Sequence, residues 1–312
     1  MKLRVLAGRL APWITIGACV WFLVATASKY SAQLSSLAVT PHIWPLLVAS
    51  AVTGLTYIAL VGGWVWSLRW WGQRIPYLEA LRIWFLSNLA RYIPGAVWQF
   101  VGLAAMCRAR GVSAVAATAG ILLQQALLLA TGLVLALGLS PQLLGAAKSP
   151  LAAGAVVVGG MVGVVVGFPL LAPRLRTIAQ RLTRRELAWP EPPMAEFGLY
   201  VAGLLVPWIA YGVAFHVFAR ALLGPAAPSP LVSVAAFVGS YVAGIIVVPA
   251  PGGLGVREVA MTAALGPAIG TESALFLAAA SRVWLILVEL ATALLVLAAH
   301  RLAGSRKAEA NA

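Results

Sequence analysis

Long apolar runs alternate with short polar breaks along the chain, and six of the runs are long enough to cross a membrane. A spanning helix needs about 20 mostly apolar residues. The predicted spans cover about Ala11–Ala27, Trp44–Ser67, Val112–Leu139, Leu151–Leu171, Phe197–Leu222 and Thr271–Ala299. The pattern therefore predicts an all-α polytopic membrane protein with about six transmembrane helices.

Two further apolar segments are interrupted by helix breakers. Pro94-Gly95 divides residues 78–110, and a Pro- and Gly-rich stretch from Pro251 to Gly255 divides residues 230–267. Proline and glycine cannot continue a helix there. Most of the resulting arms have about 11–16 residues, too few to cross. We predict two re-entrant helical hairpins, although the arm before Val248 is long enough for a crossing.

The distribution of positive charge orients the predicted spans. The chain has 22 Lys and Arg residues and 8 acidic residues, all glutamate, for a net charge of +14. With both termini in the cytoplasm, 17 of the Lys and Arg residues lie inside and four outside, as short cytoplasmic loops require. The hairpins then open to opposite faces of the membrane, and each is followed closely by a span. This arrangement predicts an inverted repeat.

Composition supports the membrane assignment. Hydrophobic residues make up 62% of the 312-residue chain and charged residues 10%, against about 45–50% and about 25% in soluble domains. In so apolar a chain, the excess positive charge favours contact with anionic lipid headgroups rather than nucleic acid. We expect a multi-pass protein of the cytoplasmic (inner) membrane.

The chain is predicted to form a single membrane domain over residues 1–303, with a disordered tail at 304–312. Its one sizeable polar segment, 172–196, is predicted to be a cytoplasmic basic loop with a short amphipathic helix. This segment is too small for a soluble catalytic domain. Ala25-Thr26-Ala27 resembles a signal-peptide cleavage site, but the preceding apolar run is longer than the usual 7–15 residues. We therefore expect the first span to be retained.

Several polar side chains are expected at membrane depth, where an isolated charge costs a few kcal/mol unless it is paired or functional. Arg282 and Glu289 are seven residues apart on one predicted helix, so both should face the bundle interior. Two interpretations of Arg282 remain open: a structural pair with a glutamate or hairpin carbonyls, or a ligand for a headgroup phosphate.

The stretch around Arg257 and Glu258 has two interpretations as well. These residues either pair with neighbours at the water boundary, or form an anion site with the preceding glycines at a helix N-terminus. Gln99 and Gln124 either line a cavity or join helices by hydrogen bonds. The candidate substrate-binding residues are Arg91, Pro94, Gly95, Gln99, Pro251, Gly252, Gly253, Gly255, Arg257, Glu258 and Arg282.

No catalytic, metal or cofactor site is expected. The chain has no aspartate, no Walker loop, and no His or Cys cluster with metal-ligand spacing. Its two cysteines, Cys19 and Cys107, lie in hydrophobic or arginine-flanked helical stretches, so neither a disulfide nor a metal site is expected from them.

Four motifs occur in an order that resembles a known family. They are Asn88 to Gln99, Arg110-Gly111-Val112-Ser113, Pro251 to Glu258, and Ser281-Arg282. Over about residues 10–300 the chain resembles the lysylphosphatidylglycerol synthase transmembrane region family. The resemblance implies a flippase-like membrane domain that moves a lipid or lipid-linked headgroup between leaflets, through a cavity between the two hairpins.

The motif positions shared with that family are Arg91, Pro94, Gly95, Pro251, Gly252, Gly253, Gly255, Glu258 and Arg282. One departure is Gln124-Gln125, where family members often carry a glutamate. The soluble aminoacyl-transferring domain of fused members does not appear in this sequence, so the resemblance implies no synthase activity.

We therefore expect a lipid translocase, not an enzyme, that carries an anionic phospholipid or a lipid-linked headgroup. Its partners are lipids, and a homo-oligomer is compatible with the sequence. The alternatives are a secondary transporter of a small soluble anion, a membrane-embedded transferase acting on a lipid, and a structural or regulatory membrane subunit.

Overall fold

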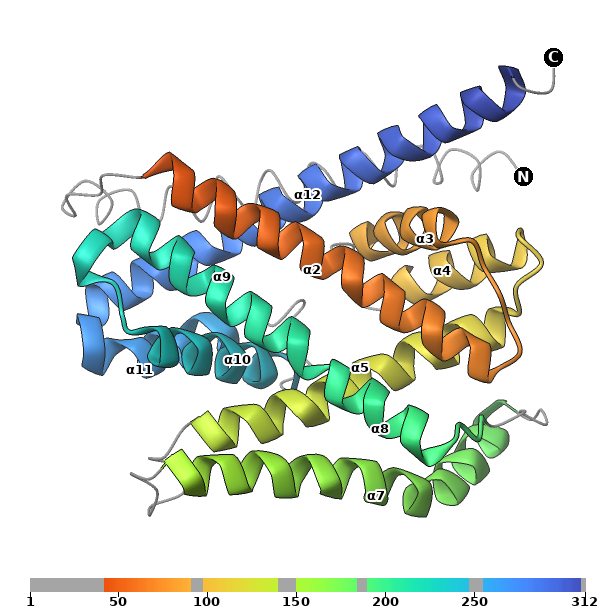
Figure 1. Cartoon of the computed structure of the whole chain (residues 1–312), viewed down its shortest axis with the longest axis horizontal. Coiled ribbons are helices and arrows are strands. Elements are labelled where there is room, and N and C mark those ends of the chain that lie inside the picture. The colour runs from red at the N-terminus through yellow and green to blue at the C-terminus, as the bar shows by residue number, and fades with distance from the viewer. Residues whose placement is uncertain (1–41, 91–97, 140–149, 184–189, 247–254, 310–312) are drawn as a thin grey trace.

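The computed structural model describes residues 42–90, 98–139, 150–183, 190–246 and 255–309, and this part of the chain consists of helices joined by short turns, with no strand (Figure 1). The elements are α2 (Ile43–Trp70), α3 (Tyr77–Leu89), α4 (Trp98–Arg108), α5 (Ala114–Leu139), α7 (Pro150–Thr183), α8 (Met194–Gly203), α9 (Leu205–Leu223), the 3-10 turn η2 (Gly224–Ala226), α10 (Pro230–Ile246), α11 (Val256–Ile269) and α12 (Thr271–Glu309). The predicted all-α fold class is confirmed.

Four stretches of helix are long and apolar enough to cross a membrane. They are Ile43–Trp70, Ala114–Leu139, Met194–Ala226 and Thr271–Ala303. All four coincide with spans predicted from the apolar runs. The predicted span at Ala11–Ala27 lies outside the described residues. The chain is thus a multi-pass membrane protein.

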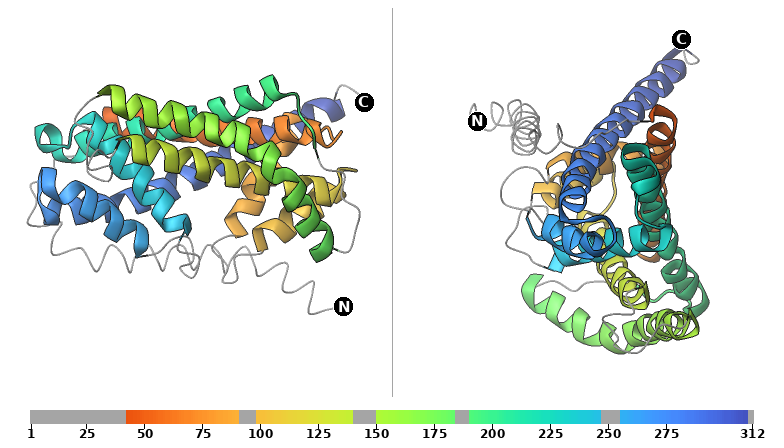
Figure 2. Two further views of the ribbon diagram at one scale, coloured as in Figure 1. Left: turned by 90° about the horizontal axis from the view of Figure 1, so that it is seen from below. Right: turned by 90° about the vertical axis from the view of Figure 1, so that its left-hand side faces the viewer.

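Helix α7 is longer than its predicted span at Leu151–Leu171. It continues to Thr183, so the first half of the predicted basic loop at 172–196 extends the preceding helix instead of forming a separate one. The alanine, leucine, glutamine and arginine residues after Leu171 favour helix. Figure 2 shows that α7 changes direction along its length. The helix contains Pro169 and Pro173, and a proline inside a helix removes a hydrogen bond and bends it.

Helix α12 also runs further than predicted. It ends at Glu309, so residues 304–309 are helical rather than part of a disordered tail. Apart from Gly304, this segment carries serine and residues of good helix propensity, and no proline stops the preceding span.

The broken segments form two pairs of short helices, α3 with α4 and α10 with α11, whose members pack against each other. They have 13, 11, 17 and 14 residues, or about 17–26 Å of helix against a hydrocarbon core about 30 Å thick. The two pairs lie toward opposite ends of the molecule and point their broken ends toward its middle (Figures 1 and 2). The re-entrant course and the inverted repeat stay predictions.

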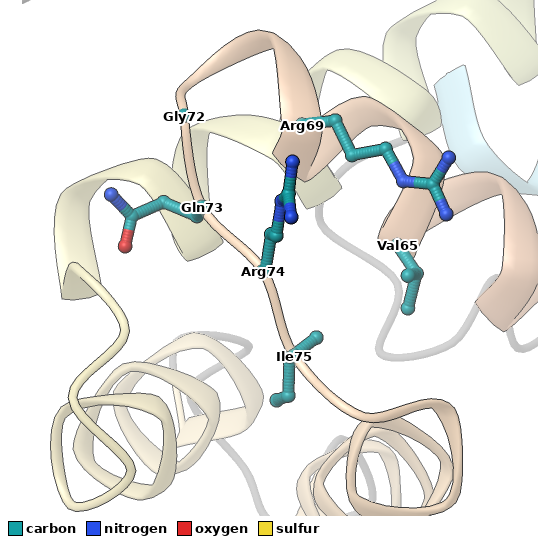
Figure 3. A pocket seen from close by; sticks show the side chains of 6 residues that line it. All are labelled: Val65, Arg69, Gly72, Gln73, Arg74 and Ile75. Atoms are coloured by element: carbon teal, nitrogen blue, oxygen red, sulfur yellow. The ribbon is translucent and has the colours of Figure 1, made fainter.

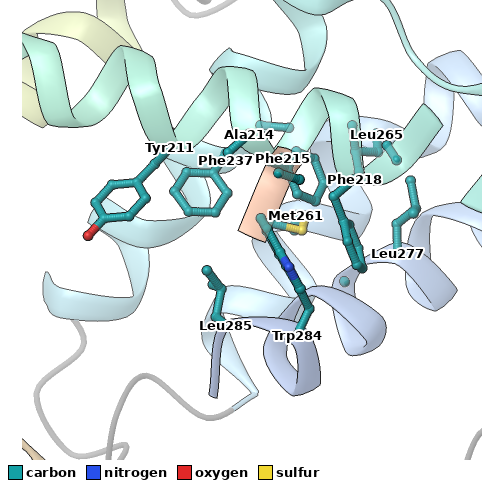
Figure 4. Close-up of a cluster of buried hydrophobic side chains, with 14 of the residues drawn as sticks. Tyr211, Ala214, Phe215, Phe218, Phe237, Met261, Leu265, Leu277, Trp284 and Leu285 are labelled. Atoms are coloured by element: carbon teal, nitrogen blue, oxygen red, sulfur yellow. The ribbon is translucent and has the colours of Figure 1, made fainter. Parts of the chain in front are cut away.

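An aromatic core holds α11 in place beside α9, α10 and α12 (Figure 4). Phe218 of α9 stacks on Trp284 of α12 with ring centroids 4.4 Å apart, and Phe215 packs on Phe237 of α10 at 5.6 Å. Met261 and Leu265 of α11 are buried in the same cluster. This packing fixes α11 against the N-terminal half of α12.

Glycines allow the long helices to approach closely. A Cβ atom at Gly132 of α5 would lie 2.6 Å from the ring of Trp208 on α9, and one at Gly54 of α2 would lie 2.9 Å from Thr292 Oγ1 on α12. Small residues at such crossings are typical of membrane helices, whose association depends on close packing.

Candidate functional site

The start of α11 is shaped by a glycine and a glutamate. Gly255 precedes the helix with φ of 83°, a conformation that glycine adopts without strain. The Oε2 atom of Glu258 accepts the N–H of Gly255 at 2.7 Å, which is the glutamate half of a capping box, since glycine has no side chain to complete it. The protein's own carboxylate thus satisfies one of the backbone donors at this helix end.

Glu258 also binds the neighbouring helix. Arg282 of α12 donates from Nε to Glu258 Oε1 at 2.5 Å, and the two side chains are only 15% and 16% exposed. Arg282 therefore faces the interior of the bundle, as predicted, and of its two interpretations the structural pair with a glutamate is present. Its direct role toward a ligand stays a prediction.

A second contact joins the other helix pair to the same face of α12. Glu289, 1% exposed, accepts a hydrogen bond at 2.5 Å from Asn88 Nδ2 near the end of α3. Since Arg282 and Glu289 are seven residues apart, they lie on one face about two turns from each other. Helix α12 consequently bridges the broken ends of both short-helix pairs.

Arg257 differs from Arg282 in having few polar partners. It is 6% exposed, and its guanidinium carbon lies 5.0 Å and 4.8 Å from the ring centroids of Phe237 and Tyr241 on α10. Within the described part of the chain its buried Nε and Nη2 atoms make no hydrogen bond. Arg282 and Glu258 are close enough to act on its charge. Ring faces attract a cation but leave its N–H donors unused.

The burial of Arg257 was not predicted. The charge pattern assigned Arg257 to the outer side of the membrane, which stays a prediction, and the structure buries this residue of α11 against α10 and close to Arg282 of α12. The charge pattern could not reveal this, because the aromatic residues that cover Arg257 belong to the preceding helix. Cation–π contact offsets part of the cost of burying the charge.

The other predicted site residues are placed as follows. Arg91, Pro94, Gly95, Pro251, Gly252 and Gly253 lie outside the described residues. Gln99 is half-buried in the first turn of α4. Gln124 is 2% exposed and donates from Nε2 to the carbonyl of Leu60 at 2.8 Å, so it joins α5 to α2. Gln125 is exposed.

Sequence reasoning missed a second carboxylate cluster, centred on Glu79 in the first turn of α3. Glu79 pairs with Arg82 and Arg110 at 2.9 Å each and with His300 Nε2 at 2.7 Å. It thereby ties α3 to the α4–α5 connection and to the end of α12. A glutamate three positions after Pro76, at a helix start, was the available signal.

The environment of Glu79 sets its protonation. Burial alone would raise the pKa of this carboxyl, but the hydrogen bond with His300 and the charges of Arg110 and Arg82 together hold the pKa below its ordinary value. Glu79 lies outside the four candidate spans. It therefore remains ionised at neutral pH and anchors the cluster.

The model of a family described as "Lysylphosphatidylglycerol synthase TM region" matches residues 5–298, nearly the whole chain. No curated protein and no solved structure matches it.

Proposed function

We propose, from the premise that the chain belongs to the lysylphosphatidylglycerol synthase transmembrane region family, that it moves a lipid between the two leaflets of the cytoplasmic membrane. The proposed cargo is an anionic phospholipid or a lipid-linked anionic headgroup. The family supports a role in lipid handling at a membrane, and the buried guanidinium of Arg257 supports the binding of an anionic headgroup.

The observation that carries the proposal is Arg257. A guanidinium binds phosphate through two parallel N–H donors, and buried donors left without a partner are costly. Arg257 has such donors at the broken start of α11. A headgroup phosphate there would satisfy them and offset the charge of the arginine.

Glu258 and Arg282 give the site a resting state. With no anion bound, Glu258 partners Arg282 and lies close enough to act on the charge of Arg257. A phosphate would compete with this carboxylate for the two guanidinium groups, so binding and release exchange one anion for another. Two arginines and one glutamate leave one positive charge uncompensated at the site, and a single negative charge on a headgroup phosphate would balance it.

The helix arrangement supports a route through the middle of the molecule. The two short-helix pairs approach from opposite ends (Figure 2), and both are joined to α12 by Asn88–Glu289 and Glu258–Arg282. Arg257 is enclosed in this structure. Headgroup passage therefore requires the two broken ends to separate in turn, while the acyl tails stay in the lipid, as in alternating access.

Orientation follows from charge. The C-terminal ends of α2, α7 and α12, which carry Arg69, Arg181 and Arg301, lie toward the same end of the molecule (Figure 1). By the positive-inside rule we propose that this end faces the cytoplasm, with the C-terminus on the same side.

The test is a leaflet-exchange assay in proteoliposomes with fluorescent phosphatidylglycerol. Arg257→Gln should abolish protein-dependent exchange, because the group that binds the phosphate is lost. The matched control is Arg220→Gln, which removes an exposed arginine at the end of α9. Equal exchange by wild type and Arg257→Gln, with both proteins folded, would reject the proposal.

A small soluble anion is the second candidate cargo, because Arg257 would accept a free phosphate equally well. A binding measurement in detergent without added lipid distinguishes the two cargoes. A soluble-anion transporter would show saturable binding of inorganic phosphate that Arg257→Gln removes, and uptake of phosphate into vesicles. A lipid translocase would show neither.

A further inference from the structure

Two adjoining cavities lie away from Arg257, at the junction of α2 and α3. The first has a volume of about 590 Å³ and is lined by Val65, Arg69, Gly72, Gln73, Arg74 and Ile75 (Figure 3). The second, of about 450 Å³, shares Val65, Arg69 and Ile75 and adds Gly62, Trp66 and Tyr77. Because they share three lining residues, the cavities form one groove, which we call the α2–α3 groove.

One end of the groove is cationic. Arg69 comes from the last turn of α2 and Arg74 from the loop that follows, and both side chains are exposed. Gln73 points away from Arg74 (Figure 3) and accepts the N–H of Ser113 at 3.0 Å, so the loop is tied to the start of α5. Two guanidinium groups beside one cavity repel each other unless an anion lies between them.

No carboxylate in the described part of the chain forms an ion pair with Arg69 or Arg74. Glu196 is near enough to act on Arg69, but its Oε1 atom accepts the indole N–H groups of Trp66 and Trp70 at 2.6 and 2.8 Å. The carboxylate is thus held against the tryptophans. The cationic end of the groove is left for an external anion.

The other end of the groove is apolar. Gly62, Val65, Trp66 and Arg69 follow the three- and four-residue spacing of one helix face, and about 10 Å of α2 separates Gly62 from Arg69. Tyr77 donates its hydroxyl to the carbonyl of Ile58 at 2.6 Å, which turns the ring along this face. Since Gly62 has no side chain, the groove stays open toward the part of α2 that lies in the hydrocarbon.

We propose that the α2–α3 groove binds one anionic phospholipid, with its phosphate between Arg69 and Arg74 and an acyl chain along α2 past Gly62. The groove is cationic at one end and apolar at the other, which matches an amphiphile. A free phosphate would occupy only the cationic end. This site is separate from Arg257 and does not depend on lipid movement. It holds a lipid of the leaflet on the Arg69 side.

The test is native mass spectrometry of the full chain in detergent, mixed with equal amounts of phosphatidylglycerol and phosphatidylcholine. Wild type should retain phosphatidylglycerol preferentially. The double variant Arg69→Gln/Arg74→Gln should lower that affinity about 25-fold, because each arginine near a lipid surface contributes about fivefold. The matched control is Arg176→Gln/Arg181→Gln, which removes two exposed arginines from α7.

A second variant tests the apolar end. A Cβ atom at Gly62 would lie 3.8 Å from the Tyr77 ring, an ordinary contact, so a side chain can be added there and would extend into the groove. Gly62→Leu should weaken binding of long-chain phosphatidylglycerol and spare a six-carbon analogue. The proposal fails if both arginine variants lose binding equally, if wild type does not distinguish the two lipids, or if Gly62→Leu affects neither chain length.

Arg257→Gln separates this site from the proposed translocation site. It should leave phosphatidylglycerol in the groove even where leaflet exchange is lost. Loss of groove binding in Arg257→Gln would show that only one lipid site exists and would overturn the inference.

Discussion

Glu79 and Glu258 occupy the same position, third in the first turn of a short helix, yet their surroundings differ. Glu79 lies at one end of the molecule among Arg82, Arg110 and His300, whose side chains are 32%, 46% and 30% exposed. Glu258 lies near the middle, where its partner Arg282 is 15% exposed. Both connect a short helix to α12, Glu79 to its C-terminal third and Glu258 to its N-terminal third.

The two clusters contain the same kinds of charged group, so their difference lies in how far water reaches those groups. In the Glu79 cluster the carboxylate is only 8% exposed, but its three cationic partners are 30–46% exposed. Water supplies the rest of the solvation of these cations, so each pair contributes less than a fully buried one. In the middle, water is excluded and every charge depends on a protein partner. Arg257 is the cation there whose hydrogen bonds are incomplete. The exposed cluster suits anchoring, and the buried one suits exchange with a ligand.

The largest expected effect is that of Glu258→Gln. It leaves Arg257 and Arg282 buried without their carboxylate, and removal of one partner from a buried pair costs about 3–5 kcal/mol. Thermal unfolding in detergent should show this loss, and Glu258→Gln/Arg282→Gln should regain part of it. The control is Glu272→Gln, at an exposed position in the first turn of α12. Similar losses for both single variants would mean that the middle is not water-excluded.

Asn88→Ala should have the next largest effect. Glu289 loses one hydrogen bond at a position that is 1% exposed, and hydrogen bonds to charged groups contribute about 1.5–3 kcal/mol. Asn88→Asp should be worse, because it places a second carboxylate beside Glu289. Unfolding curves that rank alanine below aspartate in stability would contradict this contact.

Arg110→Gln should cost about 1 kcal/mol or less, because its side chain is 46% exposed and exposed pairs are screened by salt. Added sodium chloride should reduce the difference in unfolding temperature from wild type. A loss as large as that of Glu258→Gln would remove the distinction between the two clusters.

Acidification should produce the smallest effect. The pKa of Glu79 is lower in the folded protein than its ordinary value, so its contribution is complete above the unfolded pKa of about 4.3 and is lost as pH falls through the lower folded pKa. Glu79→Gln should be less sensitive to pH below about 5 than wild type. Identical unfolding temperatures against pH for the two proteins would contradict the pairing.

The lengths of the apolar runs predicted the four candidate spans of the described residues, because a membrane span depends on local apolarity. Run length and charge did not predict where the helices end. Helices α7 and α12 continue past Leu171 and Ala303, because the residues there become more polar but keep a high helix propensity. The high cost of a charge at membrane depth correctly predicted that Arg282 faces the interior of the bundle. The same reasoning could not identify Glu258 as the partner of Arg282, because the two residues are 24 positions apart and lie on different helices.

The parts of the site that sequence reasoning missed depend on contacts between distant segments. Trp66 and Trp70 both donate to Glu196, which is more than 120 positions away in the sequence. Arg69 and Arg74 line the same cavity, and nothing in the local sequence shows this. Glu79 and His300, 221 positions apart, meet only because α3 packs on the end of α12.

The central claim is that an anionic lipid headgroup reaches Arg257, and photo-crosslinking tests it most directly. A benzophenone side chain replaces Tyr241, whose ring lies 4.8 Å from the guanidinium carbon, in vesicles with equal phosphatidylglycerol and phosphatidylcholine. Val158, exposed on α7, receives the same group as a reference. We expect phosphatidylglycerol adducts to be enriched at position 241 over position 158, and to disappear with Arg257→Gln. Absence of lipid adducts at 241, or the same lipid ratio at both positions, would contradict the account.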